Sequence, residues 1–219
     1  MATIKVIDLL NSVKTILQDT GAVRYSNDNL LKFFNDGQRE VVLHRPDANV
    51  ASATFACATG SKQSLPAAAL RLIDVVRNVN GQAVSQVEKQ MLDQNLPDWH
   101  EQLAGSNGIE HFVYETTDPK NFYVFPKAVS GTHSIEIVYS TIPADIAIAN
   151  FSTSTNVIGL DDVYANCLAD YTLYRAYQID SDEGNVSRSA MHFQAFAQSL
   201  GIKTRSDAAS SPRPIGGSA

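Results

Sequence analysis

The chain has 219 residues, of which 44% are hydrophobic and 18% charged, and its formal net charge is −6 at pH 7. A chain of this length buries roughly 70% of its unfolded surface, in one large domain or two small ones, so it needs no disulfide or metal to fold. The acidic balance excludes a dedicated DNA-binding or anionic-membrane-binding protein, because such proteins carry a basic surface.

Two amphipathic helices are predicted near the N-terminus. Apolar residues recur at helical spacing over residues 4–19, and Thr3 is expected to cap the start of this helix. A second helix is expected over residues 26–45, because the residue before Pro46 is disfavoured in a helix. Gly37 lowers the stability of this second helix and predicts close packing against a neighbouring element.

The hydrophobic period changes to two in the middle of the chain. Alternation over residues 51–57 and 134–139 predicts half-buried strands, and apolar runs at 112–114 and 122–125 flank a turn. We therefore expect residues 49–142 to form an inserted antiparallel β unit.

Helical spacing returns after Pro143. One helix is predicted at about 160–180, which holds four of the eight tyrosines, and a last helix at about 186–200. Gly201 is expected to end this last helix in a left-handed conformation. Residues 203–219 are rich in Ser, Ala, Pro and Gly and are predicted to form a flexible tail.

These elements predict an α+β fold. The helix pairs of residues 1–48 and 143–202 are expected to form one four-helix bundle, because two helices alone offer each other a single interface. The antiparallel β unit of residues 49–142 is inserted between them, and the extended C-terminal tail of residues 203–219 follows.

The search for a chemical site gives little. There is no glycine-rich phosphate loop and no nucleophile elbow, and the five histidines are scattered one at a time, unlike zinc ligands. Cys57 and Cys167 lie in apolar contexts and are interpreted as buried thiols. We expect no enzyme activity, cofactor, metal, membrane span or secretory signal.

One loop is the exception, and it keeps two interpretations. Asp98, Trp99, His100 and Glu101 place a histidine between carboxylates beside the only tryptophan, a set that suits acid–base or sugar-binding work. The alternative function is then a carbohydrate-binding or hydrolytic tail component. The structural interpretation is a loop whose tryptophan anchors it on the β unit.

Two further features are candidate contact sites. Tyr174 and Tyr177 lie near the expected solvent-exposed end of the tyrosine-bearing helix. They are either core residues or part of a subunit interface, where tyrosine is enriched. The tail is either a disordered end or an arm that orders on an oppositely charged partner. Its basic and apolar contact residues are Lys203, Arg205, Pro212, Arg213, Pro214 and Ile215.

Several of these segments together resemble a known family. The run Leu30 to Val42 followed by Pro46, Asp47 and Ala48, the run Leu160 to Tyr177, and the strands 122–126 and 135–139 are similar to tailed-phage head-to-tail adaptors. These are the portal-binding connectors, called tail tubular proteins in podoviruses. The resemblance covers about residues 4–202.

The resemblance implies a structural virion protein in the neck of a tailed phage, assembled in the host cytoplasm. It implies a homo-oligomeric ring, expected to be a dodecamer, with the portal protein above, a downstream tail or neck protein below, and DNA passing through the lumen. Its C-terminal segment is implied, by position, to grip the portal. A different neck protein, such as a stopper or tail terminator, is the third interpretation.

The composition suits such a ring. The charged fraction is 18%, against about 25% in an average protein, while Ser, Thr, Asn and Gln together supply 58 residues. Uncharged polar side chains avoid the cost of desolvating unpaired charges in several interfaces. A net negative subunit also does not hold the phosphates of the DNA that must slide through the ring.

Overall fold

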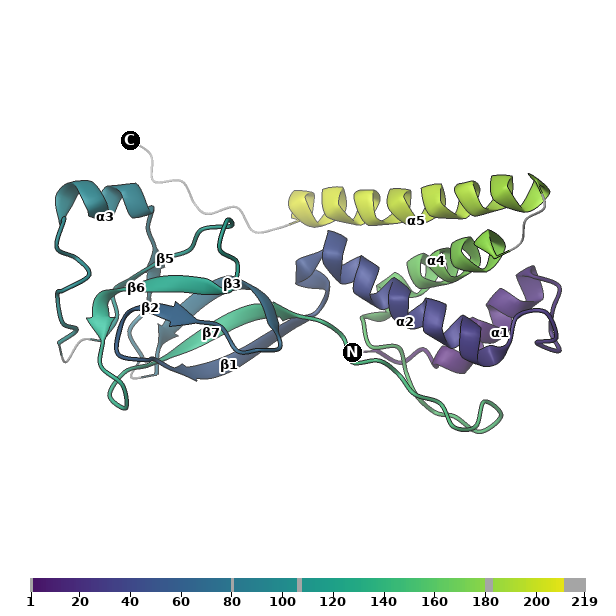
Figure 1. The fold of residues 1–219 in the computed structure, drawn as a ribbon, viewed down its shortest axis with the longest axis horizontal. Helices are drawn as coiled ribbons and strands as arrows, with labels where there is room; N and C mark the ends of the chain where they lie inside the picture. The colour runs from purple at the N-terminus through teal and green to yellow at the C-terminus, as the bar shows by residue number, and fades with distance from the viewer. Residues whose placement is uncertain (1, 80, 106–107, 180–182, 211–219) are drawn as a thin grey trace. The chain divides into compact units, whose positions relative to one another are not determined.

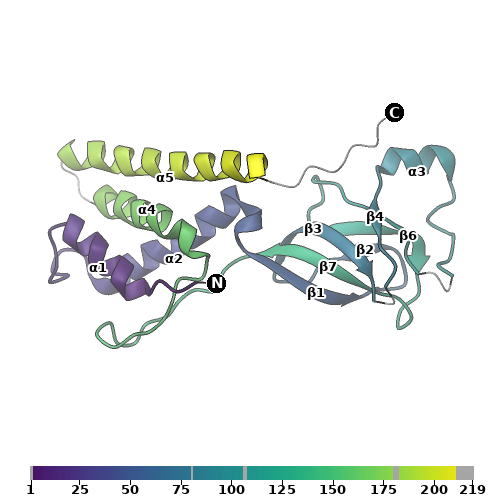
Figure 2. The ribbon, with the colours of Figure 1, turned by 180° about the vertical axis from the view of Figure 1, so that it is seen from behind.

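The computed structural model describes residues 2–79, 81–105, 108–179 and 183–210 (Figures 1 and 2). The chain divides into two units. One combines Met1–Arg45 with Pro143–Ala219, and the other is Pro46–Ile142. The first is helical and the second is built mainly of strands, so the two ends of the chain fold together and the middle folds as an insertion.

The helical unit contains four α-helices in its described residues. They are α1 (Val6–Ile16), α2 (Asn27–His44), α4 (Ala165–Gln178) and α5 (Glu183–Ser210), with a short 3₁₀ helix η2 (Asp162–Tyr164) before α4. Ser26 caps α2 by accepting the N–H of Asn29 at 3.2 Å, and α2 ends just before Pro46, as predicted. Lys5, not Thr3, is the N-cap residue of α1, so the predicted Thr3 cap is wrong.

The expected four-helix bundle is wrong. Helix α4 lies in the middle and contacts α1, α2 and α5, whereas α1 and α2 contact each other only slightly and α5 packs chiefly on α4 (Figure 1). A bundle needs each helix to contact two neighbours around a shared axis. The helices here instead pack in layers on either side of α4, and the described residues form a mixed α+β fold of five helices and two sheets.

The expected end of the last helix at Leu200 is also wrong. Helix α5 is 28 residues long and continues to Ser210. A glycine ends a helix by taking a positive φ, and Gly201 is not one of the glycines with positive φ in the described residues. Residues 203–210 of the predicted flexible tail are therefore helical, and the prediction for 211–219 lies outside the described residues.

The inserted unit has two sheets. The elements are η1 (Pro46–Ala48), β1 (Val50–Ala56), β2 (Gly60–Ser64), β3 (Ala69–Asn78), β4 (Ser85–Gln86), α3 (Lys89–Asn95), β5 (His111–Val113), β6 (Asn121–Ala128) and β7 (Ser134–Thr141). One sheet has the order β1-β7-β3 and the other β2-β6-β5-β4. Every ladder is antiparallel except the short one between β4 and β5, which is parallel.

The sheets of this unit share an apolar core. Alternate residues of β7 and β6 point into it, among them Ile135, Ile137, Phe122 and Val124, each fully buried. Burial of this kind supplies about 1.5–3 kcal/mol for each large side chain. The buried faces fix the register of the strands, because a slip by one residue would turn every core side chain outward.

Candidate interaction surfaces

Two buried amides on α2 hold the segment that returns from the β unit. Asn35 pairs with the backbone of Ile146, donating to its carbonyl at 3.0 Å and accepting its N–H at 3.1 Å. Gln38, 1% exposed, accepts the N–H of Gly159 at 2.7 Å and donates to Asn35 at 3.2 Å. These bonds provide partners for otherwise unpaired groups of a segment without regular structure.

We call the two amides, Asn35 and Gln38, the clamp. The guanidinium of Arg39 extends the clamp to the surface. Arg39 bonds Asp36 at 2.6 Å on its own helix and also Asp145 in the returning segment. The hydrogen bond to Asp36 and the neighbouring carboxylate of Asp145 raise the pKa of Arg39. The Arg39 side chain is 40% exposed, so its ion pairs add little to stability. The pair with Asp145 chiefly orients the returning segment.

Gly37, between the clamp residues, lies against α4. A Cβ at this position would be 3.0 Å from Cδ1 of Tyr171 and 3.5 Å from Leu168. The absence of a side chain allows α2 and α4 to approach closely, which confirms the packing predicted from this glycine.

The N-terminal segment is joined to the start of η2. Asp162 accepts the hydroxyl of Thr3 at 2.6 Å and the N–H groups of Thr3 and Ile4 at 2.8 and 3.1 Å. The Thr3 hydroxyl, followed by these backbone donors, lowers the pKa of Asp162. Val6 and Ile158 add backbone bonds between the same segments. Thr3 thus joins the N-terminal segment to the start of η2 and does not cap α1.

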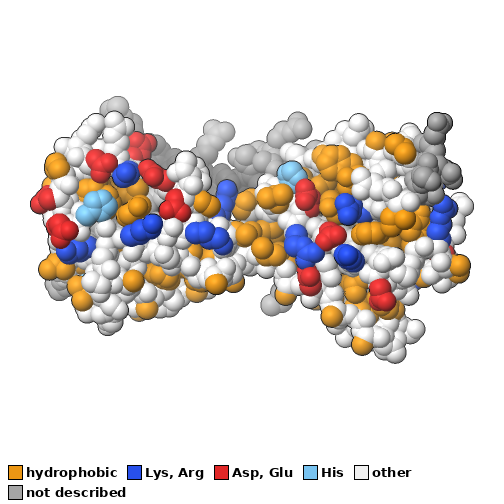
Figure 3. Space-filling view, in the orientation of Figure 1, with side chains coloured by type: hydrophobic (Ala, Val, Ile, Leu, Met, Phe, Trp, Pro, Cys, Tyr) orange, Lys and Arg blue, Asp and Glu red, His pale blue; other side chains and the backbone are white. Residues whose placement is uncertain are grey.

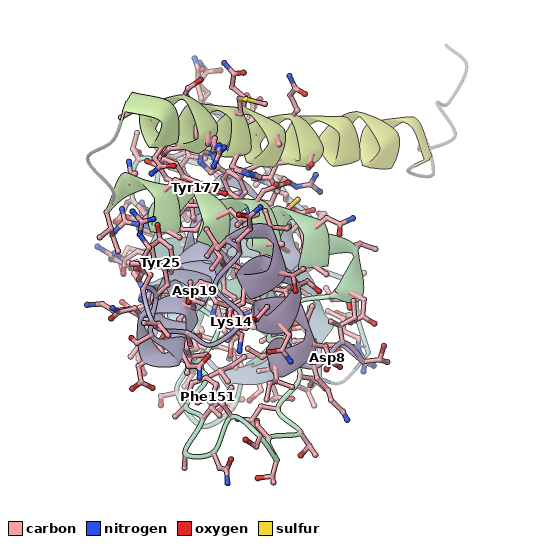
Figure 4. All side chains as sticks on the ribbon, turned by 90° about the vertical axis from the view of Figure 1, so that its right-hand side faces the viewer. Asp8, Lys14, Asp19, Tyr25, Phe151 and Tyr177 are labelled. Atoms are coloured by element: carbon pink, nitrogen blue, oxygen red, sulfur yellow. The ribbon has the colours of Figure 1, made fainter. Side chains whose placement is uncertain are left out.

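The loop between α1 and α2 is ordered by one carboxylate. Asp19 accepts the N–H groups of Tyr25, Val23 and Arg24 at 2.8 to 2.9 Å (Figure 4). These bonds, that of Tyr25 first, lower the pKa of Asp19. The carboxylate therefore fixes the turn that joins α1 to α2.

The tyrosines of α4 form much of the contact with α5. Tyr177 is 7% exposed and lies between the two helices (Figure 4), with its ring stacked on His192 at 5.7 Å. Tyr174 is half-buried, with its ring 5.0 Å from that of Phe193. The assignment of Tyr174 and Tyr177 to a subunit interface stays a prediction. In the single chain, most of the Tyr177 ring is covered by α5.

The candidate docking residues fall on both sides of the end of α5. Lys203 and Arg205 lie in the last two turns of α5. Pro212, Arg213, Pro214 and Ile215 lie outside the described residues.

The loop that contains Trp99 is held by structural contacts. Trp99 is 0% exposed, its indole N–H donates to Asp93 at 2.9 Å, and its ring stacks on His100 at 3.7 Å. His100 bonds Ser61 at 2.7 Å, and Glu101 bonds Lys127 at 2.8 Å, an interaction that lowers the pKa of Glu101. A fully buried indole offers no face to a sugar, so this loop anchors α3 on the β unit.

Charged side chains of the two signs are not segregated on the face seen in Figure 3. On the face in Figure 3, basic and acidic side chains are interspersed among uncharged ones. Within the described ranges, no three His, Cys, Asp or Glu side chains are grouped as metal ligands. Nor does any helix of these ranges have the length and apolarity to cross a bilayer.

Comparison with known proteins identifies the family. No curated protein matches the chain. The model of the SU10 adaptor protein family matches residues 4–216, nearly the whole chain and both structural units. The matched range includes the clamp residues Asn35 and Gln38 of α2 and most of the segment beyond α5. The chain therefore belongs to the SU10 adaptor protein family, a family of phage head-to-tail adaptors.

Proposed function

We propose that this protein is the subunit of an adaptor ring that joins the portal of the phage head to the tail. The observation that carries the proposal is the family match over residues 4–216. The fold supports it, because helices from before and after the β unit form one helical unit, while the β unit is a second compact unit available for other contacts. In the described part of the chain, Trp99, His100 and Glu101 form hydrogen bonds that hold their loop on the β unit, which supports a role without catalysis.

We propose twelve copies in the ring, located in the virion neck after assembly in the host cytoplasm. Each subunit would contact two neighbours, the portal and a downstream tail or neck protein. Interfaces of this kind bury about 1,600 Å² each. The 58 uncharged polar residues and the low charged fraction of 18% suit a surface covered on several sides.

The C-terminal segment is proposed to dock on the portal. Lys203, Arg205 and Arg213 outnumber Asp207 here, so the segment is basic although the chain carries −6. Its first part continues α5, which would present Lys203 and Arg205 from a helix. Pro212, Pro214 and Ile215 would add apolar contacts.

Two truncations test this docking. Removing residues 211–219 deletes Arg213 and the apolar contacts but keeps all of α5, whereas removing 203–219 also deletes its last two turns. Both truncated chains are expected to keep the thermal unfolding of the full chain and to attach less to the portal, the longer deletion more severely. Undiminished attachment of the chain without residues 203–219 would exclude the docking role.

Electron microscopy tests the ring itself. Negatively stained images of the protein mixed with its portal are expected to show a twelve-fold ring attached directly to the portal. A ring that joins the complex only after another neck protein would indicate a stopper or tail terminator.

The lumen is proposed to let DNA pass without binding it. Phosphate affinity increases with the number of Lys and Arg contacts, and the chain has 17 Lys and Arg against 23 Asp and Glu. The ring is therefore expected to bind duplex DNA weakly at moderate salt. Tight binding that weakens steeply as salt is added would contradict DNA passage through this ring.

A further inference from the structure

Strand β1 leaves one edge of its sheet open. β1 lies at the margin of the sheet β1-β7-β3 in both ribbon views (Figures 1 and 2). Its ladder with β7 runs without a register shift from Val50 to Ala56. The strand has seven residues, none of them charged and none a proline.

The direction of the free backbone groups follows from the ladder. Bonds between Asn49 and Thr141 and between Cys57 and His133, both 3.0 Å, mark its two ends. Hydrogen-bonded residues alternate along an antiparallel pair. The odd-numbered residues of β1 therefore direct their backbone N–H and C=O groups toward β7. Val50, Ser52, Thr54 and Ala56 therefore direct their N–H and C=O groups away from the sheet, and all four residues are exposed.

The opposite edge of the same sheet is protected. Strand β3 has three register shifts against β7 and carries Arg71, Asp74 and Arg77. Arg77 is bridged to Ala83, and the ammonium of Lys120 donates to the carbonyl of Ala69. Bulges, charges and covering groups are the devices by which proteins prevent strand addition.

The edge strands of the second sheet are also less open. β2 has a bulge between Gly60 and Lys62, and Lys62 lies 3.9 Å from Asp118. β4 has only two residues. Among the strands that the structure describes, β1 alone combines a regular ladder, seven residues and no charge at a sheet margin.

We infer that β1 pairs, along its open edge, with an extended segment of a neighbouring copy of this chain. The inference rests on the proposed ring. One strand added to a seven-residue edge buries only a few hundred Å², far below the ~1,600 Å² of a stable interface. Its occupant must therefore be held by further contacts, as the adjacent subunit of a ring is. In such a contact β1 of each copy meets a different surface of the next, which is the head-to-tail type of interface from which closed rings are built.

Hydrogen exchange of the wild-type protein tests the inference without any substitution. In the monomer, the amides of Ser52 and Thr54 are expected to exchange fast while those of Ala51, Ala53 and Phe55 are protected by β7. In the assembled ring, the amides of Ser52 and Thr54 should slow by at least about tenfold. An intact ring in which they exchange as fast as in the monomer overturns the inference but leaves the proposed function standing.

A matched pair of variants adds a functional readout. Thr54→Pro removes an outward N–H without removing a bond to β7, as edge strands tolerate, whereas Thr54→Val keeps the N–H. Both variants are expected to unfold at the same temperature. Ring formation should nevertheless fall at least about tenfold for Thr54→Pro and stay unchanged for Thr54→Val. Normal rings from folded Thr54→Pro overturn the inference. So does protection of Ser52 and Thr54 that is absent from the assembled ring and appears only when a further protein binds to that ring, which would assign the edge to that protein. Wild-type protein that forms no ring, alone or on its portal, overturns both proposals.

Discussion

The side-chain oxygen of Gln38 accepts the backbone N–H of Gly159 at 2.7 Å, and the same oxygen occupies the space where a side chain on residue 159 would begin. A Cβ on residue 159 would lie 2.6 Å from that oxygen. One contact therefore specifies a glutamine on α2 and a glycine in the segment before η2. It joins the two halves of the helical unit across 121 residues of sequence.

Gln38→Ala is expected to lower the free energy of unfolding by about 1–3 kcal/mol, because it removes both the part-buried hydrogen bond from the N–H of Gly159 and the buried one to Asn35. Gln198→Ala is a matched control, since Gln198 is exposed on α5 and its loss should change stability by less than about 0.5 kcal/mol. Urea unfolding followed by circular dichroism measures both. Equal stability of the two variants would show that the contact does not hold the returning segment.

Gly159→Ala tests the same contact from the other side. The new methyl group meets the Gln38 oxygen, so the variant should be destabilised, and the double variant with Gln38→Ala should be less destabilised than the sum of the two. The unfolding free energies of the four proteins form a double-mutant cycle. Simple additivity would mean that the residues act independently.

Two glycines in helices give opposite expectations for substitution by alanine. Alanine favours a helix by about 1 kcal/mol over glycine. At Gly37 the Cβ would be 3.0 Å from the ring of Tyr171, and this ring is itself packed on Phe196 at 5.2 Å, so Gly37→Ala should destabilise by about 1–3 kcal/mol. At Gly201 nothing lies within 4 Å, so Gly201→Ala should stabilise α5. Thermal unfolding measures the direction of both stability changes, and a Gly37→Ala protein more stable than the wild type would contradict the tight packing.

Local sequence signals predicted much of this fold. Ser26 and Pro46 bound α2 as expected, period-two alternation located β1 and β7, and the apolar contexts of Cys57 and Cys167 correctly indicated buried free thiols. These signals work because capping, proline sterics and amphipathic spacing act within a few residues.

The errors arose where partners are distant or where one residue has two possible conformations. Periodicity shows which face of a helix is buried but not what covers it, so it did not reveal that α4 is the central helix. The bond between Thr3 and Asp162 spans 159 residues and has no local signature. Gly201 was expected to take the left-handed conformation, yet α5 continues through it. The polar residues Asn35 and Gln38 within an apolar helix pattern are the one local sequence signal of the clamp.

Lowering the pH should weaken the attachment of the N-terminal segment. The pKa of Asp162 is lowered, first by the hydroxyl of Thr3, from the ordinary value of 3.8. A depressed folded-state pKa means that the ionised carboxylate stabilises the fold above about 3.8, and that this contribution is lost as the pH falls through the lower folded value. Wild-type stability should therefore fall more steeply than that of Asp162→Asn in that window. Parallel pH profiles of the two proteins would contradict the role of this carboxylate.

Both cysteines should resist thiol reagents in the folded protein. Cys57 is 2% exposed, and burial raises its pKa to about 11; burial also raises the pKa of Cys167. The thiolate is the reactive form, so a mildly alkaline reagent solution should label neither residue until denaturant is added, when both react. Fast labelling of one thiol in the folded chain would show that its site opens.

The buried tryptophan offers a direct test against a sugar-binding role. Trp99 is the only tryptophan of the chain, so fluorescence excited at wavelengths that tyrosine does not absorb reports on this loop alone. Trp99→Phe keeps an aromatic ring on Phe125 and Tyr123 but removes the indole N–H bonded to Asp93, and it should cost about 1–3 kcal/mol of stability. Titration of the wild-type protein with oligosaccharides of the bacterial surface should leave its emission unchanged, since a ring with no exposed face cannot stack on a sugar. A saturable shift in emission would require the loop to open, and it would restore the binding interpretation that the buried indole argues against.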